Sequence, residues 1–430
     1  MIRMDQGRRS GTDEAALARL WAWIAAVEPR RRIRQPQPDA DPERAEEAGP
    51  VLDREERPWR RDVVGLLVLF VVTRVVLIVI GLFARELAPE PVVRPQPLGI
   101  GTRYSSFPFL DLWGQWDSAW YLSIAEDGYR AVPLLRSFAN YAFFPLYPLL
   151  ARWVGWVVGG PYVGGLVVSN AAFLVASVFL YRLVAIDDDV DTARRAVTYL
   201  LAAPAAFLFS AMLSESVYLA LAVMCFYFAR TKRWWAVGVL GFLLALSRAP
   251  GVLVVIPLLW MYLEQRRFSL RRVRPDLLWL ALLPAGIGVF MWANEVLTGD
   301  ALAFSRIQVT AWGHRLEDPV AALWRNVSGD NPFWRFNGWY LIVVLALTLA
   351  LWRRFGAAYL LFVLVSVLPP MSYGVWYSMV RYTAVIFPLY VVAARITDSR
   401  PHLDQTAMVA SALLQGFLMS QWANNSHLVV

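Results

Sequence analysis

The sequence predicts an all-α integral membrane protein, a bundle of about eleven transmembrane helices, in the range of roughly 10–12. Of the 430 residues, 58% are hydrophobic, whereas a soluble domain holds about 45–50%. Long apolar runs recur between residues 63 and 421. A helix needs about 20 such residues to cross a bilayer core of ~30 Å. In lipid every backbone polar group must be paired within the protein, so helices are the expected spanning elements.

The N-terminal residues 1–61 differ from the rest of the chain, and we expect a largely disordered cytoplasmic segment there. They are rich in charge and proline, a composition that buries too little apolar surface to fold. Arg19 interrupts their most apolar stretch, and "EPRRRIR" follows where a signal peptide would carry small residues. Arg60 and Arg61 directly precede the first apolar run, which places the N-terminus in the cytoplasm by the positive-inside rule.

The same rule orders the remaining apolar runs, because arginines cluster in alternate short segments between them. The segment 141–158 is apolar but contains Pro145, Pro148 and Arg152. Treating it as an interfacial or re-entrant element keeps the basic stretch at 265–274 cytoplasmic. The predicted spans then lie near 63–84, 162–185, 195–212, 215–230, 234–248, 250–264, 276–297, 338–352, 356–370, 380–395 and 405–421.

This topology gives a membrane domain over residues 62–421 and a short tail at 422–430. Two large extracytoplasmic loops are expected, at 85–140 and 298–336, and the first should carry short interfacial helices. The expected location is the plasma membrane, with several passes through it. Any chemistry must therefore use the extracytoplasmic loops and the adjoining helix ends.

Several function classes are excluded by composition or by missing motifs. The net charge of +8 is held in the short loops that anchor spans, so we expect no nucleic-acid partner. The chain has no GxxxxGK[ST], HExxH or GxSxG motif. His314, His402 and His427 are far apart in sequence, and no metal site or cofactor is predicted. Cys225 is the only cysteine, so no disulfide can form within the chain.

The stretch "LDLWGQWDSAWYLSIAEDGY" at 110–129 is the strongest candidate for chemistry. It places Asp117 in the first extracytoplasmic loop, close to the membrane, where a carboxylate can act as a general base toward a hydroxyl. Flat rings surround it and suit stacking on sugars; these are Trp113, Trp116, Trp120 and Tyr121. The alternative is an aromatic belt at the bilayer interface with acids facing water. Asp111 and Glu126 are expected to support this site or the loop.

Six sequence blocks resemble the PIG-V family of polytopic mannosyltransferases, in its bacterial form, which belong to the GT-C class of membrane glycosyltransferases. "WDSAWYLSIAEDGY" followed by "NYAFFPLYPLL" carries the most specific similarity. "LLAAPAAFLFSAMLSESVYLAL", "ALSRAPGV", "FSRIQVTAWG" and "MVRYTAVIFPLY" follow in the family's order. The similarity covers roughly residues 63–395 and leaves the N-terminal segment outside it.

The resemblance implies an inverting mannosyltransferase that uses a polyprenyl-phosphate sugar, a donor already present in the bilayer. The family's acid in the first outside loop falls on Asp117, the presumed base. Arg248 and Arg381 are the expected phosphate ligands, with Arg306 as a third, since guanidinium groups pair well with phosphate. Glu215, which opens an apolar run after Ser214, is expected either to orient substrate or to cap its helix.

Three questions stay open at the level of sequence. Arg74 lies within the first span and should face a polar partner inside the bundle. "HRLEDP" at 314–319 is either part of the acceptor entrance or a solvated loop. A transporter is an alternative function, but it predicts acids near the bilayer midplane, and a GT-C enzyme for arabinose or glucose is another. The acceptor, which is a lipid-linked, glycan or protein molecule, is not identified, and membrane lipids are the other expected partner.

Overall fold

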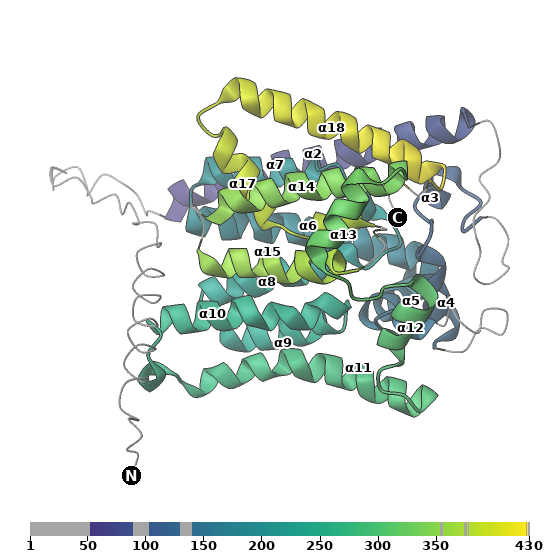
Figure 1. Cartoon of the computed structure of the whole chain (residues 1–430). Helices are drawn as coiled ribbons and strands as arrows, with labels where there is room; N and C mark the ends of the chain where they lie inside the picture. Colours follow the sequence, from purple (N-terminus) through teal and green to yellow (C-terminus); the bar gives the residue numbers. More distant parts are fainter. Residues whose placement is uncertain are drawn as a thin grey trace, which may run out of the picture.

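The computed structural model describes residues 52–88, 103–129, 140–352, 356–373, 376, 378–426 and 428, and this part of the chain is almost entirely helical (Figure 1). Its only β pairing is one antiparallel bridge between Leu316 and Tyr373. The prediction of an all-α fold is therefore confirmed. The expected N-terminal segment over residues 1–61 falls almost wholly outside the described part of the chain.

Four helical stretches are long and apolar enough to cross a membrane, namely Val64–Glu86, Pro161–Asp187, Pro275–Thr298 and Pro332–Leu349. They belong to α2 (Leu52–Glu86), α6 (Pro161–Asp187), the pair η7 (Pro275–Ala281) and α11 (Leu282–Thr298), and α14 (Pro332–Trp352). Their length and composition make the chain a membrane-embedded protein. The total of about eleven spans stays a prediction.

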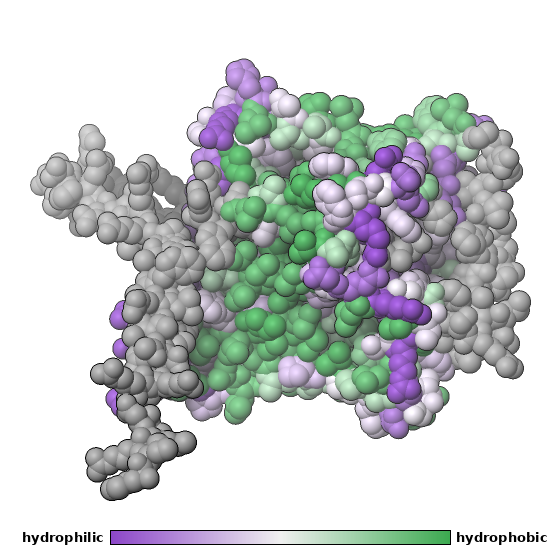
Figure 2. All heavy atoms as spheres, in the orientation of Figure 1, coloured by the Kyte–Doolittle hydropathy of each residue, from purple (hydrophilic) through white to green (hydrophobic). Residues whose placement is uncertain are grey.

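The remaining helices of the bundle pack among these four (Figure 1). They are α7 (Val190–Leu201), α8 (Glu215–Arg230), α9 (Trp234–Ala245), η5 (Ala249–Val254), α10 (Val255–Gln265), η6 (Leu270–Arg272), α15 (Ala357–Met371), α16 (Met379–Ala384), α17 (Pro388–Thr397) and α18 (Pro401–Ala423). Figure 2 shows apolar side chains over the middle of the bundle and hydrophilic ones toward its two ends, as a membrane protein requires.

The predicted span over 195–212 is wrong as a continuous helix, because α7 ends at Leu201, three residues before Pro204. The following stretch, which includes η4 (Ala206–Ser210), has backbone carbonyls without α-helical partners. Side chains from α2 and α18 bind several of these carbonyls. Gln415 Nε2 donates to the carbonyls of Leu201 (3.0 Å) and Ala203 (2.9 Å). This irregular segment is therefore stable inside the bundle.

Arg74 of α2 is one of the side chains that bind this break. Its guanidinium donates to the carbonyl of Ala206 at 2.9 Å and to Ser210 Oγ at 3.0 Å, and it lies 5.3 Å from the ring centre of Phe173. The sequence predicted a polar partner for Arg74 inside the bundle, and the structure shows two, the backbone carbonyl of Ala206 and the hydroxyl of Ser210. Arg74 fixes the segment that leads to Ser214 and α8.

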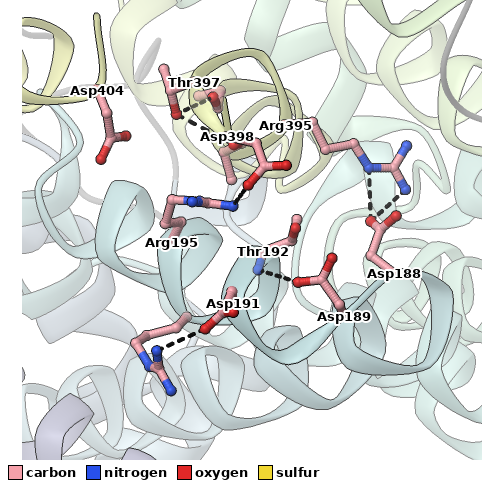
Figure 3. Close-up of polar contacts among 12 residues, drawn as sticks. Asp188, Asp189, Asp191, Thr192, Arg195, Arg395, Thr397, Asp398 and Asp404 are labelled. Atoms are coloured by element: carbon pink, nitrogen blue, oxygen red, sulfur yellow. Dashed lines mark hydrogen bonds and ion pairs between the residues drawn. The ribbon is translucent and has the colours of Figure 1, made fainter. Parts of the chain in front are cut away.

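The end of the bundle where α6 turns into α7 is tied together by ion pairs (Figure 3). Arg395 Nε donates to Asp188 Oδ2 at 2.7 Å, and Arg195 pairs with Asp398 between α17 and α18. Asp189 caps α7 by accepting from the backbone N–H of Thr192 at 2.7 Å. Further pairs at this end are Arg194–Asp62 and Arg230–Asp187. The arginines that the positive-inside rule assigned to one face therefore gather at one end of the bundle.

The opposite end carries the short helices of the two large loops and those that directly follow the first loop (Figure 1). They are α3 (Pro108–Asp111), α4 (Ser118–Asp127), η3 (Asn140–Ala142), α5 (Leu146–Val158), α12 (Ala303–Trp312) and α13 (Pro319–Ser328). The 13 residues of α5 span about 20 Å, less than the ~30 Å of a bilayer core. Because α9, α10 and α17 are shorter still, this length does not separate a spanning helix from an interfacial one, and the interfacial or re-entrant element at 141–158 stays a prediction.

Candidate active site

A cavity of about 690 Å³ lies at the end of the bundle that carries α4 and α12. This volume falls within the range of small-molecule sites, about 300–1,000 Å³. Its wall is built by segments far apart in sequence. The polar and aromatic residues that line it include Trp116, Asp117, Tyr121, Tyr218, Ser247, Arg248, Gln308, Trp312, His314, Tyr373, Ser378, Arg381 and Tyr382. The remainder is apolar and includes Phe143, Phe304, Leu253, Pro369 and Pro370.

Asp117 occupies the N-cap position of α4, and its side chain lines the cavity. It makes no capping hydrogen bond, so the carboxylate is directed to other partners. The preceding residue, Trp116, has a φ of 50°. This left-handed conformation costs a bulky residue about 1–2 kcal/mol and tends to occur at functional sites. The strained turn orients the carboxylate of Asp117 toward α16.

A chain of alternating charges runs along one wall of the cavity. Arg381 of α16 donates hydrogen bonds from Nη1 to Asp117 Oδ2 and from Nε to Glu215 Oε1. Glu215 Oε1 also lies 2.5 Å from Arg248 Nη1. The order is therefore Asp117, Arg381, Glu215, Arg248, with acid and base alternating. The structure brings together four residues that the sequence proposed separately.

Glu215 holds the two arginines in place from behind the wall. It is the first residue of α8 and is fully buried, with 0% exposure. A buried carboxylate requires charged partners, since desolvation of a lone ion costs several kcal/mol. Ser214 makes no side-chain capping bond to α8, and its hydroxyl lies against that of Tyr121 instead. The contacts of Glu215 with Arg248 and Arg381 support a role for it in positioning them.

Both arginines keep a face toward the cavity while they bind Glu215. The guanidinium of Arg248 lies 5.7 Å from the ring centre of Tyr382, an arrangement typical of a cation–π contact. Arg248 precedes η5, and Arg381 lies three residues after Ser378, which has a φ of 65°. Irregular backbone thus delivers both cations to one place. Together they form a fork that suits a phosphate group.

Tyr121 lies beneath Asp117 on α4 and lines the cavity floor. Its hydroxyl and that of Ser214 are 2.8 Å apart. Burial, with the negative charge of Glu215 adding to it, raises the pKa of Tyr121 to about 12. The phenol is therefore neutral at neutral pH. It acts as a fixed hydrogen-bonding group between α4 and α8, and Asp117 is the group able to accept a proton there.

Besides Glu215, two of the predicted substrate-binding residues do not line the cavity. Trp120 packs behind the wall, with its ring 5.7 Å from that of Phe143. Arg306 lies on the far side of α12 from Phe304 and Gln308, which face the cavity. Its side chain is 70% exposed and pairs with Asp300 at 3.2 Å. The expectation that Arg306 binds phosphate has no support in this placement.

The two predicted supporting acids also lie outside the cavity wall. Asp111 Oδ2 accepts from Arg85 Nη1 at 2.9 Å, and Asp111 Oδ1 accepts from the backbone N–H of Tyr104 at 2.7 Å. Asp111 therefore ties the first loop to the end of α2. Glu126 is exposed near the end of α4, where partial burial and the neighbouring Asp127 raise its pKa.

The structure adds residues that the sequence analysis did not select. His314, Tyr373 and Tyr382 line the cavity. Tyr382 directly follows Arg381 in the "MVRYTAVIFPLY" block, so its position in the sequence could have identified it as a site residue. His314 lies in the loop for which a solvated surface was the alternative. Among the described residues, no group of three or more His, Cys, Asp or Glu side chains is arranged to hold a metal ion.

No protein-family model and no curated protein matches the chain in sequence. Among solved structures, it is similar to ArnT from Cupriavidus metallidurans bound to undecaprenyl phosphate, at 13% identity and a TM-score of 0.49, over 85% of this chain and 77% of that one. It is also similar to the oligosaccharyltransferase of Archaeoglobus fulgidus, at 13% identity and a TM-score of 0.40, over 83% of this chain. The match spans 53% of the oligosaccharyltransferase chain, about half its length.

Proposed function

We propose that the protein is a membrane glycosyltransferase that moves a sugar from a polyprenyl-phosphate donor to a hydroxyl-bearing acceptor. The observation that carries this proposal is the chain Asp117, Arg381, Glu215, Arg248 along a cavity of about 690 Å³. It combines a general base, two guanidinium groups and an apolar compartment. These are the parts that such a transfer requires.

The reaction is a single displacement at the anomeric carbon of the donor. The acceptor oxygen forms a bond to that carbon and its proton passes to Asp117. The bond between the carbon and the phosphate oxygen breaks, and its electron pair leaves with the polyprenyl phosphate. Attack opposite the leaving group inverts the anomeric configuration. Arg248 and Arg381 stabilise the negative charge that grows on the leaving phosphate.

The resting contact between Arg381 and Asp117 gives donor binding a second effect. While Arg381 binds Asp117, its guanidinium occupies an oxygen of the carboxylate. A donor phosphate that competes for the same guanidinium weakens this contact. Asp117 is therefore released to act as a base when the donor is bound, and it stays paired with Arg381 while the site is empty.

The charges of the arginine site suit a phosphodiester donor that takes the place of Asp117. Arg248 and Arg381 carry two positive charges, and Glu215 and Asp117 carry two negative charges, so the resting network is balanced. A phosphodiester with one negative charge can replace the Asp117 carboxylate on Arg381. Phe304, Leu253 and the two prolines at the end of α15 offer apolar surface for the first units of a polyprenyl chain. Because the donor comes from the bilayer, no nucleotide-binding fold is needed.

The sugar is mannose in this proposal, on the strength of the sequence blocks that resemble PIG-V enzymes, and arabinose or glucose are the alternatives to test. The site faces the extracytoplasmic side of the plasma membrane. A transporter has less support, because the acids of this site lie at one end of the bundle, whereas the transport alternative calls for acids near the midplane.

The decisive experiment is a transfer assay in nanodiscs with polyprenyl phosphates that carry labelled mannose, glucose or arabinose. Asp117→Asn keeps the shape of the side chain and removes the base. We expect its rate to fall by roughly 10²–10⁴-fold. Asp127→Asn, which removes an acid from the same helix outside the cavity, is the matched control.

Two results would contradict the proposal. One is an Asp117→Asn protein that inserts stably and transfers sugar at the wild-type rate. The other is a folded wild-type protein that consumes none of the three donors, which would direct attention to lipid or solute transport.

A further inference from the structure

His314 lies on the part of the cavity wall that the second large loop forms. It follows Gly313, whose φ of 69° ends α12 in the left-handed conformation that favours glycine. The backbone N–H of His314 donates to the carbonyl of Gln308 at 3.1 Å. The imidazole is 8% exposed and lines the cavity. The loop thus directs the ring inward.

The ring is held in place by a second segment of the chain. It stacks on Tyr373 with ring centres 4.4 Å apart and planes 3° from parallel. Two residues further along, the loop pairs with the end of α15, through the bridge between Leu316 and Tyr373 and a 2.8 Å bond from Glu317 N–H to the Ser372 carbonyl. This stacked and paired geometry fixes the ring of His314 in the cavity, whereas the residues 315–318 that follow it are exposed.

Asp117 faces His314 across the cavity. Burial lowers the pKa of His314 below its ordinary 6.5, while the negative charge of Asp117 acts to raise it. Among the described residues, no hydrogen bond joins the two side chains. The neutral imidazole has one donor and one acceptor nitrogen. The space between the ring and the carboxylate therefore suits a molecule that carries hydroxyl groups.

Other charged groups around the ring have partners of their own. On its own loop Glu317 pairs with Arg325 at 2.7 Å, and Asp318 caps α13. The remaining titratable groups are Arg315 on the loop, which is exposed, Tyr373 at the end of α15, and Arg381 and Tyr382 on α16. Arg381 is bound to two carboxylates. Asp117 is thus the acid that His314 meets in the cavity.

We propose that His314 binds the acceptor, with its neutral ring hydrogen-bonded to a hydroxyl of the molecule that Asp117 deprotonates. This inference rests on the proposed transferase function. The transferred proton goes to Asp117, and His314 neither gains nor loses a proton in the step. Protonation of the ring at acidic pH turns its acceptor nitrogen into an N–H donor, so the ring can no longer accept a hydrogen bond from the acceptor hydroxyl.

The first test needs no substrate. Histidines labelled with ¹³C at Cε1 are titrated by NMR in nanodiscs, and the three signals are assigned with His402→Asn and His427→Asn variants. We expect the His314 signal to titrate below its ordinary pKa and to move lower still in Asp117→Asn, because the charge that favours the protonated ring is gone. An unchanged titration in that variant overturns the coupling.

The second test separates binding from titration with two variants. His314→Phe keeps a ring against Tyr373 but has no nitrogen, and we expect KM for the probe acceptor octyl α-mannopyranoside to rise roughly two- to tenfold, with the donor KM unchanged. His314→Gln keeps a donor and an acceptor but cannot titrate, so the loss of rate on the acidic side of about pH 6.5 should be absent. His402→Gln, at the start of α18, is the control.

These outcomes distinguish the inference from the function beneath it. If both His314 variants keep the wild-type KM for the acceptor and the wild-type loss of rate at acidic pH, the acceptor role is overturned. If no donor sugar is consumed at all, the proposed function fails, and the acceptor role fails with it. The NMR titration then still decides whether His314 and Asp117 are coupled.

Discussion

Arg381 binds Asp117 across 264 residues of sequence, joining the second-last apolar region of the chain to the first large loop. The contact is made between the N-cap of α4 and the single turn and a half of α16. Neither element is long enough to span a membrane. Short irregular helices at one end of a rigid bundle thus build the candidate site, and the long helices hold them in register.

Arg381→Lys tests whether the fork geometry of the guanidinium is required. A lysine keeps the charge, but one ammonium nitrogen replaces the two guanidinium nitrogens that reach Asp117 and Glu215 separately, so the geometry of both contacts is lost. We expect kcat to fall by roughly 10²–10³-fold, measured as transfer from a polyprenyl-phosphate sugar. Arg335→Lys, an exposed arginine on α14, is the control. Equal rates in the two variants would show that charge alone is enough.

Glu215→Gln tests whether the buried carboxylate holds the two arginines together. The substitution leaves Arg248 and Arg381 facing each other without the shared acid, and loss of one partner in a buried network costs about 3–5 kcal/mol. Cys225, which is fully buried in α8, offers a native reporter because a thiol-reactive dye labels it only on unfolding. We expect a clear fall in the unfolding temperature.

The matched variant for this position is Glu215→Asp, which keeps the charge but shortens the reach. It should lie between the wild type and Glu215→Gln. If Glu215→Gln unfolds at the wild-type temperature, the carboxylate is not what stabilises the arginine pair.

The sequence predicted the fold class and the composition of the site better than the contacts within it. Apolar runs indicated where helices lie, and Asp117, Glu215, Arg248 and Arg381 were found as polar residues at the ends of such runs. Their partners were not readable, because helix ends distant in sequence meet only after packing. Arg306 was misjudged for the same reason, since its helix turns that side chain away from the cavity.

The irregular segments were the other limit of the sequence analysis. Pro204 offered a signal that the apolar run over 195–212 is broken, but hydropathy alone treats such a run as one helix. The break exists because Arg74, Ser411 and Gln415 bind its carbonyls. Similarly, the polar residues around His314 suggested a solvated loop, and only the contact with Tyr373 places the ring in the cavity.

Gly164→Ala tests the close approach of α5 to α6, which supports the floor below α4. A Cβ on Gly164 would lie 2.3 Å from the Ala151 carbonyl oxygen and 2.5 Å from the Gly155 nitrogen, so backbone must move. We expect a loss of about 1–3 kcal/mol, seen as earlier labelling of Cys225 on heating. Gly288→Ala on α11, where a Cβ meets no atom within 4 Å, should unfold at or above the wild-type temperature. A similar fall in both variants would refute the packing argument.

Cysteine labelling tests the orientation in the membrane. The candidate site and the Arg-rich loops lie at opposite ends of the bundle, so one must be outside and the other inside. Cys225 is buried and gives little background, which allows single cysteines to be placed at Ser106→Cys and Arg267→Cys. A maleimide that does not cross membranes should label the first in intact cells and the second only after permeabilisation. The reverse pattern would place Asp117 in the cytoplasm, where an acceptor and a lipid-linked donor would have to be found on the inner leaflet instead.

Labelling at Arg267→Cys is the more informative half of this experiment. The segment that carries this residue follows α10, and it changes side of the membrane if α5 is counted as a full span. A result on the cytoplasmic side therefore supports both the orientation of the site and the short, non-spanning character of α5.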